Sequence, residues 1–277
     1  MIRSSKHGYN TYCSSKTFKN RNSKISKFQK ILEAARSRDI NEADTVVIVT
    51  DMLEQIFGMD KYTDITREYA IKGTYVDLAV TLENKLIYLV EVKAIGLELK
   101  SNHLRQVVDY AAKEGVKWAV LTNGIEWEIH RVIVSGQVSS EEVVSFSFLD
   151  LSHRKESDLE LVYLLCKKGV SQDRIEDFYE HQQACNKFVL GALLGSDDSV
   201  SLVKRLLKKI TPGIKVTDEE IKDIIESQVI KREVQNSESG IEAQKKVKKI
   251  LAKNNKAKPK KSEPSDSEVP SPQIGTL

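Results

Sequence analysis

Two strand-like segments separated by only three residues constrain the fold of this chain more than any other feature. Residues 76–82 and 86–93 are both rich in β-branched and aliphatic side chains, and Glu83, Asn84 and Lys85 between them suit a turn. The two segments are therefore predicted to pair as an antiparallel hairpin. A turn centred on Asn84 also sets the register, because residues equally distant from Asn84 then face each other.

Charged residues interrupt the apolar pattern at the open end of this hairpin. The register places Asp77 opposite Glu91, and the alternation of side chains puts Lys93 on the same side of the sheet. Two carboxylates about 5 Å apart repel each other unless a cation or a proton lies between them. The other side of the hairpin is predicted to carry the apolar residues Val76, Leu78, Val80, Tyr88, Val90 and Val92.

A bound cation competes with a simpler interpretation, in which the charges belong to an ordinary solvated strand face. Residues 86–92 are apolar almost throughout, as in a strand that is covered on both faces. Charges inserted into such a strand are costly, so the pattern favours a functional site.

The same residues match a known motif. Asp77, the run Glu91-Val92-Lys93, and Gln106 with Tyr110 on the following helix resemble the pattern of the PD-(D/E)xK nuclease superfamily. Val76 stands where the name of the superfamily has proline, which is a common substitution there.

More narrowly, residues 40–135 resemble the N-terminal nuclease domain of type I restriction enzyme R subunits, with a similar helix start at 41–45 and a similar strand turn at 121–127. The resemblance implies an α/β (α+β) fold with a restriction-endonuclease-like core, in which helices flank a mixed central sheet. Periodicity and turn residues predict compatible elements: helices at 42–57 and 101–114, and strands at 64–71, 74–82, 86–94, 116–121, 125–132 and 143–149.

The resemblance implies Mg²⁺-dependent hydrolysis of phosphodiester bonds, with Mn²⁺ as a substitute. Asp77, Glu91 and the backbone carbonyl of Val92 would bind the metal, since Mg²⁺ takes a few hard oxygen ligands and keeps several waters. Lys93 would position the attacking water or stabilise the developing charge. Glu42 is a further candidate ligand, although the helix dipole by itself also favours a glutamate in a first turn.

The helix predicted at 101–114 carries the remaining candidate residues. Gln106 and Tyr110 are four residues apart and share a face, which in the resembling family looks toward the active site. Gln106 is thus a candidate for orienting the attacking water, and Tyr110 for contacting nucleic acid or for packing the helix. Arg105 is a candidate phosphate contact, with a merely solvated arginine as the alternative.

Charge and composition divide the rest of the chain. We predict a disordered basic arm at 1–25, the nuclease-like domain at 26–152, an all-helical region at 153–235 and a largely disordered tail at 236–277. The arm is either a nucleic-acid tether or a solubilising segment. Helices in the helical region are predicted at 158–167, 171–194, 200–210 and 218–234, and the tail allows a short helix at 241–252.

Several classes of function are disfavoured. The 277 residues contain no apolar run long enough to span a bilayer and no hydrophobic segment of a signal peptide, so we expect a cytoplasmic protein without a membrane partner. Cys13, Cys166 and Cys185 lack the spacing of a zinc site or a disulfide framework. The net charge of +3 decides nothing about nucleic acid.

The leading hypothesis is a metal-dependent endonuclease that acts on DNA in restriction or defence. No P-loop motif is present, so the chain either cuts alone or depends on a separate translocase or modification subunit; a homodimer is also compatible with the sequence. Two alternatives stay open: a non-catalytic nucleic-acid-binding or assembly subunit that keeps the nuclease fold, and an RNA nuclease.

Overall fold

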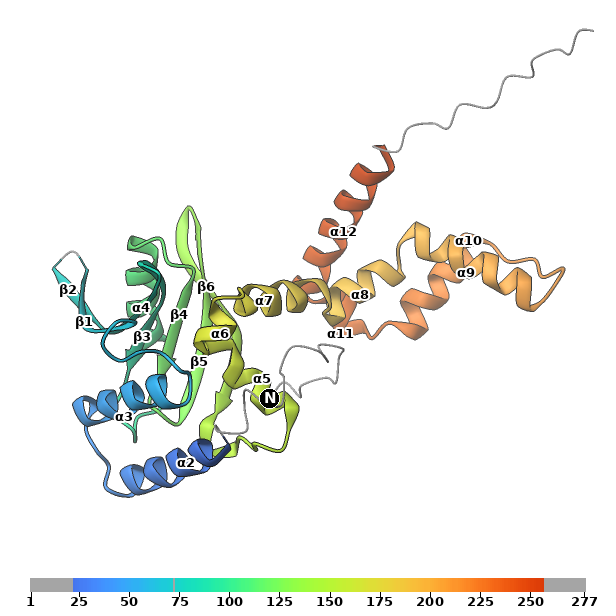
Figure 1. The fold of residues 1–277 in the computed structure, drawn as a ribbon. Coiled ribbons are helices and arrows are strands. Elements are labelled where there is room, and N and C mark those ends of the chain that lie inside the picture. Colours follow the sequence, from blue (N-terminus) through green and yellow to red (C-terminus); the bar gives the residue numbers. More distant parts are fainter. Residues whose placement is uncertain (1–21, 72, 257–277) are drawn as a thin grey trace, which may run out of the picture. The chain divides into compact units, whose positions relative to one another are not determined.

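A six-stranded mixed sheet organises the first of two units, which ends at Glu180 in this computed structural model (Figure 1). The structure describes residues 22–71 and 73–256. Every neighbouring pair of strands is antiparallel except β3 and β4, which are parallel. The strands lie in chain order across the sheet: β1 Ile65–Ile71, β2 Thr74–Leu82, β3 Lys85–Val92, β4 Trp118–Thr122, β5 Glu126–Ser135 and β6 Gln137–Ser147.

The parallel pair explains the helix α4, Ser101–Lys113, because two parallel neighbours need a crossover connection and a helix supplies it. One side of α4 packs on one face of the sheet. This face forms a cluster that includes Ala79, Leu89, Val107, Val108, Ala111 and Ala119.

The other face of the sheet carries the larger core. It is covered by α2 (Asn22–Ser37), α3 (Glu42–Gln55), α5 (Glu156–Leu165) and the short α6 (Lys167–Val170), with a 3₁₀ turn, η1, at Phe148–Asp150. Leu78, Val80, Tyr88, Val90 and Val92 point into this core, as the alternation predicted. The predicted fold class is therefore confirmed: a mixed sheet lies between helices, and a helical region follows.

The central hairpin has the predicted register near its open end, where Leu78 pairs with Val90 and Ala79 with Leu89. The turn itself is tighter than predicted. Leu82 pairs with Lys85, so only Glu83 and Asn84 form the turn, and both have positive φ, 51° and 62°. A bulge between Val80 and Thr81 adds one residue on β3 and restores the register.

Val76 departs from the prediction, because it packs with the α4 cluster and not with Leu78. Its strand neighbour β1 contains Glu68 in a left-handed conformation, with φ 48°. Such a residue interrupts the regular pleat and increases local twist. The outer part of the β1–β2 hairpin thus turns Tyr69, Ile71 and Val76 toward α4.

The first unit reaches further along the chain than residue 152, the predicted end of the nuclease-like part. Helix α5 is built into the main core, where Val162, Leu165 and Cys166 are buried. Strand β6 also begins at Gln137, six residues before its predicted start. Apart from Val138, residues 137–142 are polar and mostly exposed on an edge strand, so they lack the alternation by which strands are predicted.

The second unit begins at His181 and, in its described part, consists of helices. Helix α7 (Arg174–Ala184) runs across the division between the units. The others are α8 Lys187–Leu194, α9 Asp197–Ile210, α10 Asp218–Ile224, the π-helical η2 Ile225–Val229, α11 Arg232–Asn236 and α12 Glu238–Lys256. The predicted helix at 171–194 is broken because the side chain of Asn186 caps α8 by accepting from the N–H groups of Phe188 and Val189.

The chain ends fit their predictions only in part. Residues 22–25 belong to α2, whereas residues 1–21 of the predicted arm lie outside the described residues. Helix α12 is longer than the short helix that the tail allowed, and residues 257–277 again lie outside the described part. Among the described helices, none is both long and apolar enough to cross a bilayer.

Candidate active site

The hairpin brings Asp77 on β2 to the end of β3. Oδ2 of Asp77 accepts a hydrogen bond of 2.7 Å from the backbone N–H of Val92. The adjacent pair Leu78–Val90 in the same register sets Asp77 across from Glu91. The sequence prediction had grouped these residues by register alone.

Lys93 joins Glu91 to a residue from another element. Its Nζ lies 2.7 Å from Oε1 of Glu91 and 3.4 Å from Oε2 of Glu42. Glu42 is the first residue of α3, whose N-terminus is capped by Asn41, since Oδ1 of Asn41 accepts from the N–H of Asp44 at 2.9 Å. The cap fixes the start of α3 and with it the position of Glu42 beside Lys93.

The backbone at Lys93 and the loop after it are held by the turn between β4 and β5. The N–H of Lys93 donates to the carbonyl oxygen of Thr122 at 2.8 Å. The side chain of Asn123 is buried, and its Nδ2 donates to the carbonyl oxygen of Leu97 at 2.9 Å. Its Oδ1 accepts from the N–H groups of Ile125 and Glu126, so the side-chain amide of Asn123 links the turn to the loop that follows Lys93.

Glu91 has a buried oxygen without a partner. The residue is only 2% exposed, and among the described residues no hydrogen-bond donor reaches its Oε2. Burial, followed by the nearby Asp77 carboxylate, raises the pKa of Glu91 to about 7. An unpaired carboxylate oxygen in such a place is costly, and a cation would relieve that cost.

The pKa values of Asp77 and Lys93 are shifted as well. Burial raises the pKa of Asp77 more than the hydrogen bond from Val92 lowers it. Burial alone would lower the pKa of Lys93, but its hydrogen bond and attraction to Glu91 outweigh this and raise it. Three carboxylates, those of Glu42, Asp77 and Glu91, thus share one ammonium group, and the ionised cluster is negatively charged.

The cluster fits a metal such as Mg²⁺ but is not a complete cage of side chains. Within residues 22–71 and 73–256, no three His, Cys, Asp or Glu side chains are grouped so that they could hold a metal ion. Mg²⁺ is nevertheless commonly held by one or two carboxylates together with waters and substrate phosphates. The free oxygen of Glu91, next to Asp77, matches that mode of binding.

Sequence reasoning missed one acidic neighbour of this cluster. The pairs Arg67–Leu78 and Tyr69–Val76 on β1 and β2 set Glu68 opposite Asp77, and the charge of Glu68 contributes to the raised pKa of Asp77. The information was present in the sequence. A hairpin closed between Ile71 and Thr74 gives this register in the same way as the turn at Asn84 did for β2 and β3.

The remaining candidates, Arg105, Gln106 and Tyr110, lie on α4. Gln106 and Arg105 are exposed, and Arg105 lies 4.0 Å from Asp109, while in the described structure neither has a hydrogen bond or ion pair with the carboxylates. Tyr110 is half-buried against the α4 side of the sheet, with Nζ of Lys113 5.4 Å from its ring centre. Packing is thus one role of Tyr110, and a role of Gln106 in catalysis stays a prediction.

Residues 59–145 match the family model for the type I restriction enzyme R protein N terminus. The resemblance found in the sequence is confirmed for this segment. The match runs from the end of the α3 region into β6, and it includes Asp77, Glu91 and Lys93, whereas Glu42 precedes it. No curated protein and no solved structure was found to match the chain.

Proposed function

We propose that this chain is a Mg²⁺-dependent endonuclease that hydrolyses phosphodiester bonds of DNA, of the restriction or defence type. The main support for the proposal is Oε2 of Glu91, which is buried beside Asp77 without a hydrogen-bond partner among the described residues. This oxygen is available as a metal ligand in an anionic, partly desolvated site. The match of residues 59–145 to a restriction-enzyme domain supports the same reaction class. A translocase, if one is required, would come from a separate subunit.

In this proposal each residue of the cluster has a distinct task. Asp77 and Glu91, with the carbonyl of Val92, would hold Mg²⁺, and Glu42 would be a further or water-bridged ligand. When bound, Mg²⁺ supplies charge that polarises the scissile phosphate and lowers the pKa of water. The hydrogen bond from Val92 engages one oxygen of Asp77 and so fixes the direction of the other.

Lys93 contributes a positive charge and a free N–H. An ammonium group has three donors, and Glu91 and Glu42 accept two of them in the structure. The third donor is available to a phosphate oxygen or to the attacking water, where it would stabilise the charge that develops in the transition state. Its raised pKa keeps Lys93 protonated at neutral pH.

The test is cleavage by the purified full chain with plasmid DNA, single-stranded DNA and RNA, each with and without Mg²⁺ or Mn²⁺. We expect metal-dependent cleavage of DNA by the wild type and its loss, by a factor of at least about 100, in Asp77→Asn and Lys93→Ala. Asn at position 77 keeps an oxygen that can accept from Val92, so the fold is retained. Asp109→Asn, on α4, is the control with the same change of charge.

Each result bears on a stated alternative. Metal-dependent cleavage that survives both Asp77→Asn and Lys93→Ala would remove these residues from the mechanism. Cleavage of RNA but not DNA would favour the RNA nuclease, and DNA binding by the wild type with no cleavage of any substrate would favour a non-catalytic subunit.

A further inference from the structure

Helix α12 presents one apolar side and one lysine-rich side, and the structure fixes which of them faces outward. Gly240, Ala243 and Val247 are buried, and α12 packs with them against α8 and α11. With 3.6 residues per turn, the side opposite these residues carries Lys245, Lys249 and Lys253, all of them exposed. We call these three residues the α12 lysine face.

The lysine face is a regular array and not a set of salt bridges. Lys245, Lys249 and Lys253 are four residues apart, so successive side chains leave the helix at intervals of about 6 Å along its axis. Within the described residues, none of the three lysines is in an ion pair with a carboxylate, whereas Lys204 pairs with Asp218 elsewhere in this unit. Glu242 lies on the same side of the helix one turn before Lys245, and with three lysines against one glutamate this side stays positively charged.

The net charge differs in sign between residues 22–180 and residues 181–277. Residues 22–180, which contain the candidate active site, have 20 Lys and Arg against 27 Asp and Glu. Residues 181–277 have 18 Lys and Arg against 13 Asp and Glu. A polyanion such as DNA therefore meets a net negative charge on residues 22–180, and the net positive charge that attracts it belongs to residues 181–277 and to the five Lys and Arg of residues 1–21.

We propose that the α12 lysine face binds the phosphate backbone of DNA and holds the substrate of the nuclease unit. The inference rests on the proposed function in taking DNA as the partner. Lysine arrays that neutralise phosphates give affinity without sequence preference, which suits a docking surface separate from the cutting site.

An anionic membrane surface fits the α12 lysine face less well than DNA does. A helix that lies on a membrane inserts an apolar side and keeps its lysines at the margin. In α12, Ala243 and Val247 are buried within the protein, and the exposed Ile241 and Ile250 lie on opposite flanks of the helix, so no continuous apolar side is exposed along its described residues. An exposed row of lysines without a continuous apolar side matches a polyanion such as DNA, whose phosphates need no apolar contact.

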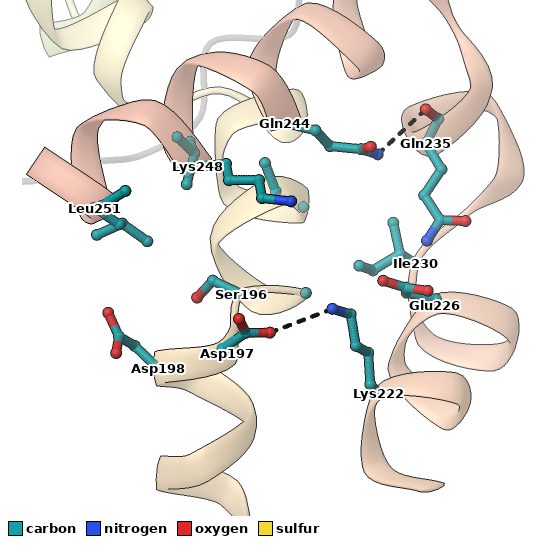
Figure 2. Close-up of a pocket in the computed structure, with 15 residues that line it drawn as sticks. Ser196, Asp197, Asp198, Lys222, Glu226, Ile230, Gln235, Gln244, Lys248 and Leu251 are labelled. Carbon is teal, nitrogen blue, oxygen red and sulfur yellow. Dashed lines mark hydrogen bonds and ion pairs between the residues drawn. The ribbon is translucent and has the colours of Figure 1, made fainter. Parts of the chain in front are cut away.

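Lys248 provides a matched control on the same helix. Figure 2 shows Lys248 with Gln244 and Leu251 around a pocket of about 430 Å³, which is also lined by Asp197 and Lys222. Lys248 is exposed and is not in an ion pair among the described residues, as is the case for its neighbour Lys249. The two differ in direction, since Lys248 belongs to the pocket side and Lys249 to the lysine face.

The experiment measures binding of the full chain to a fluorescent DNA duplex by anisotropy, in EDTA so that no cleavage occurs, over a range of salt concentrations. The variant is Lys245→Gln/Lys249→Gln/Lys253→Gln, since glutamine preserves helix propensity. We expect its plot of log affinity against log salt to be shallower than that of the wild type by about 3, at about 0.9 per phosphate contact. Arg205→Gln/Lys208→Gln/Lys209→Gln on α9 removes the same charge from another helix.

The outcomes separate this proposal from the nuclease assignment, because binding in EDTA does not depend on catalysis. A larger loss for the α12 variant than for the α9 variant, and for Lys249→Gln than for Lys248→Gln, supports the lysine face. Equal losses would show a general effect of net charge and overturn it. Unchanged DNA binding together with lost binding to vesicles containing phosphatidylserine would also overturn it and assign the face to a membrane.

Discussion

Replacement of Glu91 by glutamine tests the electrostatic account of the site without requiring any substrate. Gln has nearly the shape of Glu and keeps an oxygen that can accept from Lys93, but it cannot ionise. In the wild type the carboxyl group is 2% exposed, and its pKa is raised to about 7 by burial and by Asp77. The variant therefore removes one titration, together with the negative charge that pairs with Lys93, and changes the shape of the site little.

The direction of the effect follows from the raised pKa. Below its ordinary value of 4.5, Glu91 is protonated in both the folded and the unfolded chain, and its stabilising contribution is fully present. As the pH rises through about 7, the folded protein must ionise a buried group, and that contribution is lost. A shift of this size corresponds to about 3 kcal/mol at about 1.4 kcal/mol per pKa unit.

We expect the metal-free wild type to lose about 3 kcal/mol of unfolding free energy between pH 4.5 and pH 8 relative to Glu91→Gln. Mg²⁺ should reverse this loss at pH 8, because it binds the ionised form. At a concentration 100 times its dissociation constant for the wild type it would add about 2.7 kcal/mol to the wild type and much less to the variant, which lacks one of the two main carboxylate ligands.

Urea unfolding followed by circular dichroism, at several pH values with EDTA or Mg²⁺, provides the measurement. Glu98→Gln, an exposed residue on the loop after Lys93, is the control and should behave as the wild type does. The reasoning is refuted if the wild type and Glu91→Gln have the same dependence on pH, or if Mg²⁺ stabilises both equally.

Two further predictions concern the support of the site and the N-terminal segment. Asn123→Ala should lower the unfolding free energy by about 2 kcal/mol in urea titrations, because it removes the hydrogen bonds to Leu97, Ile125 and Glu126. Asn123→Asp keeps only the acceptor, so its unfolding free energy should lie between those of the wild type and Asn123→Ala. Equal stability of all three proteins would contradict the assigned role of Asn123. Deletion of residues 1–21 should weaken DNA binding more at low than at high salt in the anisotropy assay, and an equal loss at both would rule out an electrostatic tether.

The hairpin shows which parts of the site the sequence could predict. Asp77 and Glu91 were placed together by the alternation of apolar residues and by the turn at Asn84, and both are local properties of the chain. The predicted register survived an error about the turn, because the bulge after Val80 compensates for the shorter loop. The sequence predicted neither the bulge nor the two-residue turn, since a bulge leaves no clear mark in composition.

Contacts between distant segments were harder to predict. That Glu42 reaches Lys93 depends on how α3 packs on the sheet, and this packing is set by many apolar residues together. The extension of the first unit to Glu180 has the same origin, since α5 was predicted correctly as a helix while its burial against the sheet was not. The full length of α12 was not predicted because its lysines are typical of a disordered tail, although Ala243 and Val247 form an apolar side that packs against the protein.

The cluster at the end of β3 has a cost that folding alone does not explain. Glu91 occupies a position that an apolar residue could fill, between Val90 and Val92 in the part of β3, residues 88–92, that is buried throughout. Replacing buried ionic groups by apolar ones is often neutral or stabilising, so Lys93 does not by itself account for the presence of Glu91. The hydrogen bond from Val92 and the ion pair with Glu42 further restrict the cluster to one geometry. A costly group held in a fixed geometry is expected where its free oxygen has a ligand to bind, and this is the physical reason for assigning the chemistry of the chain to this place.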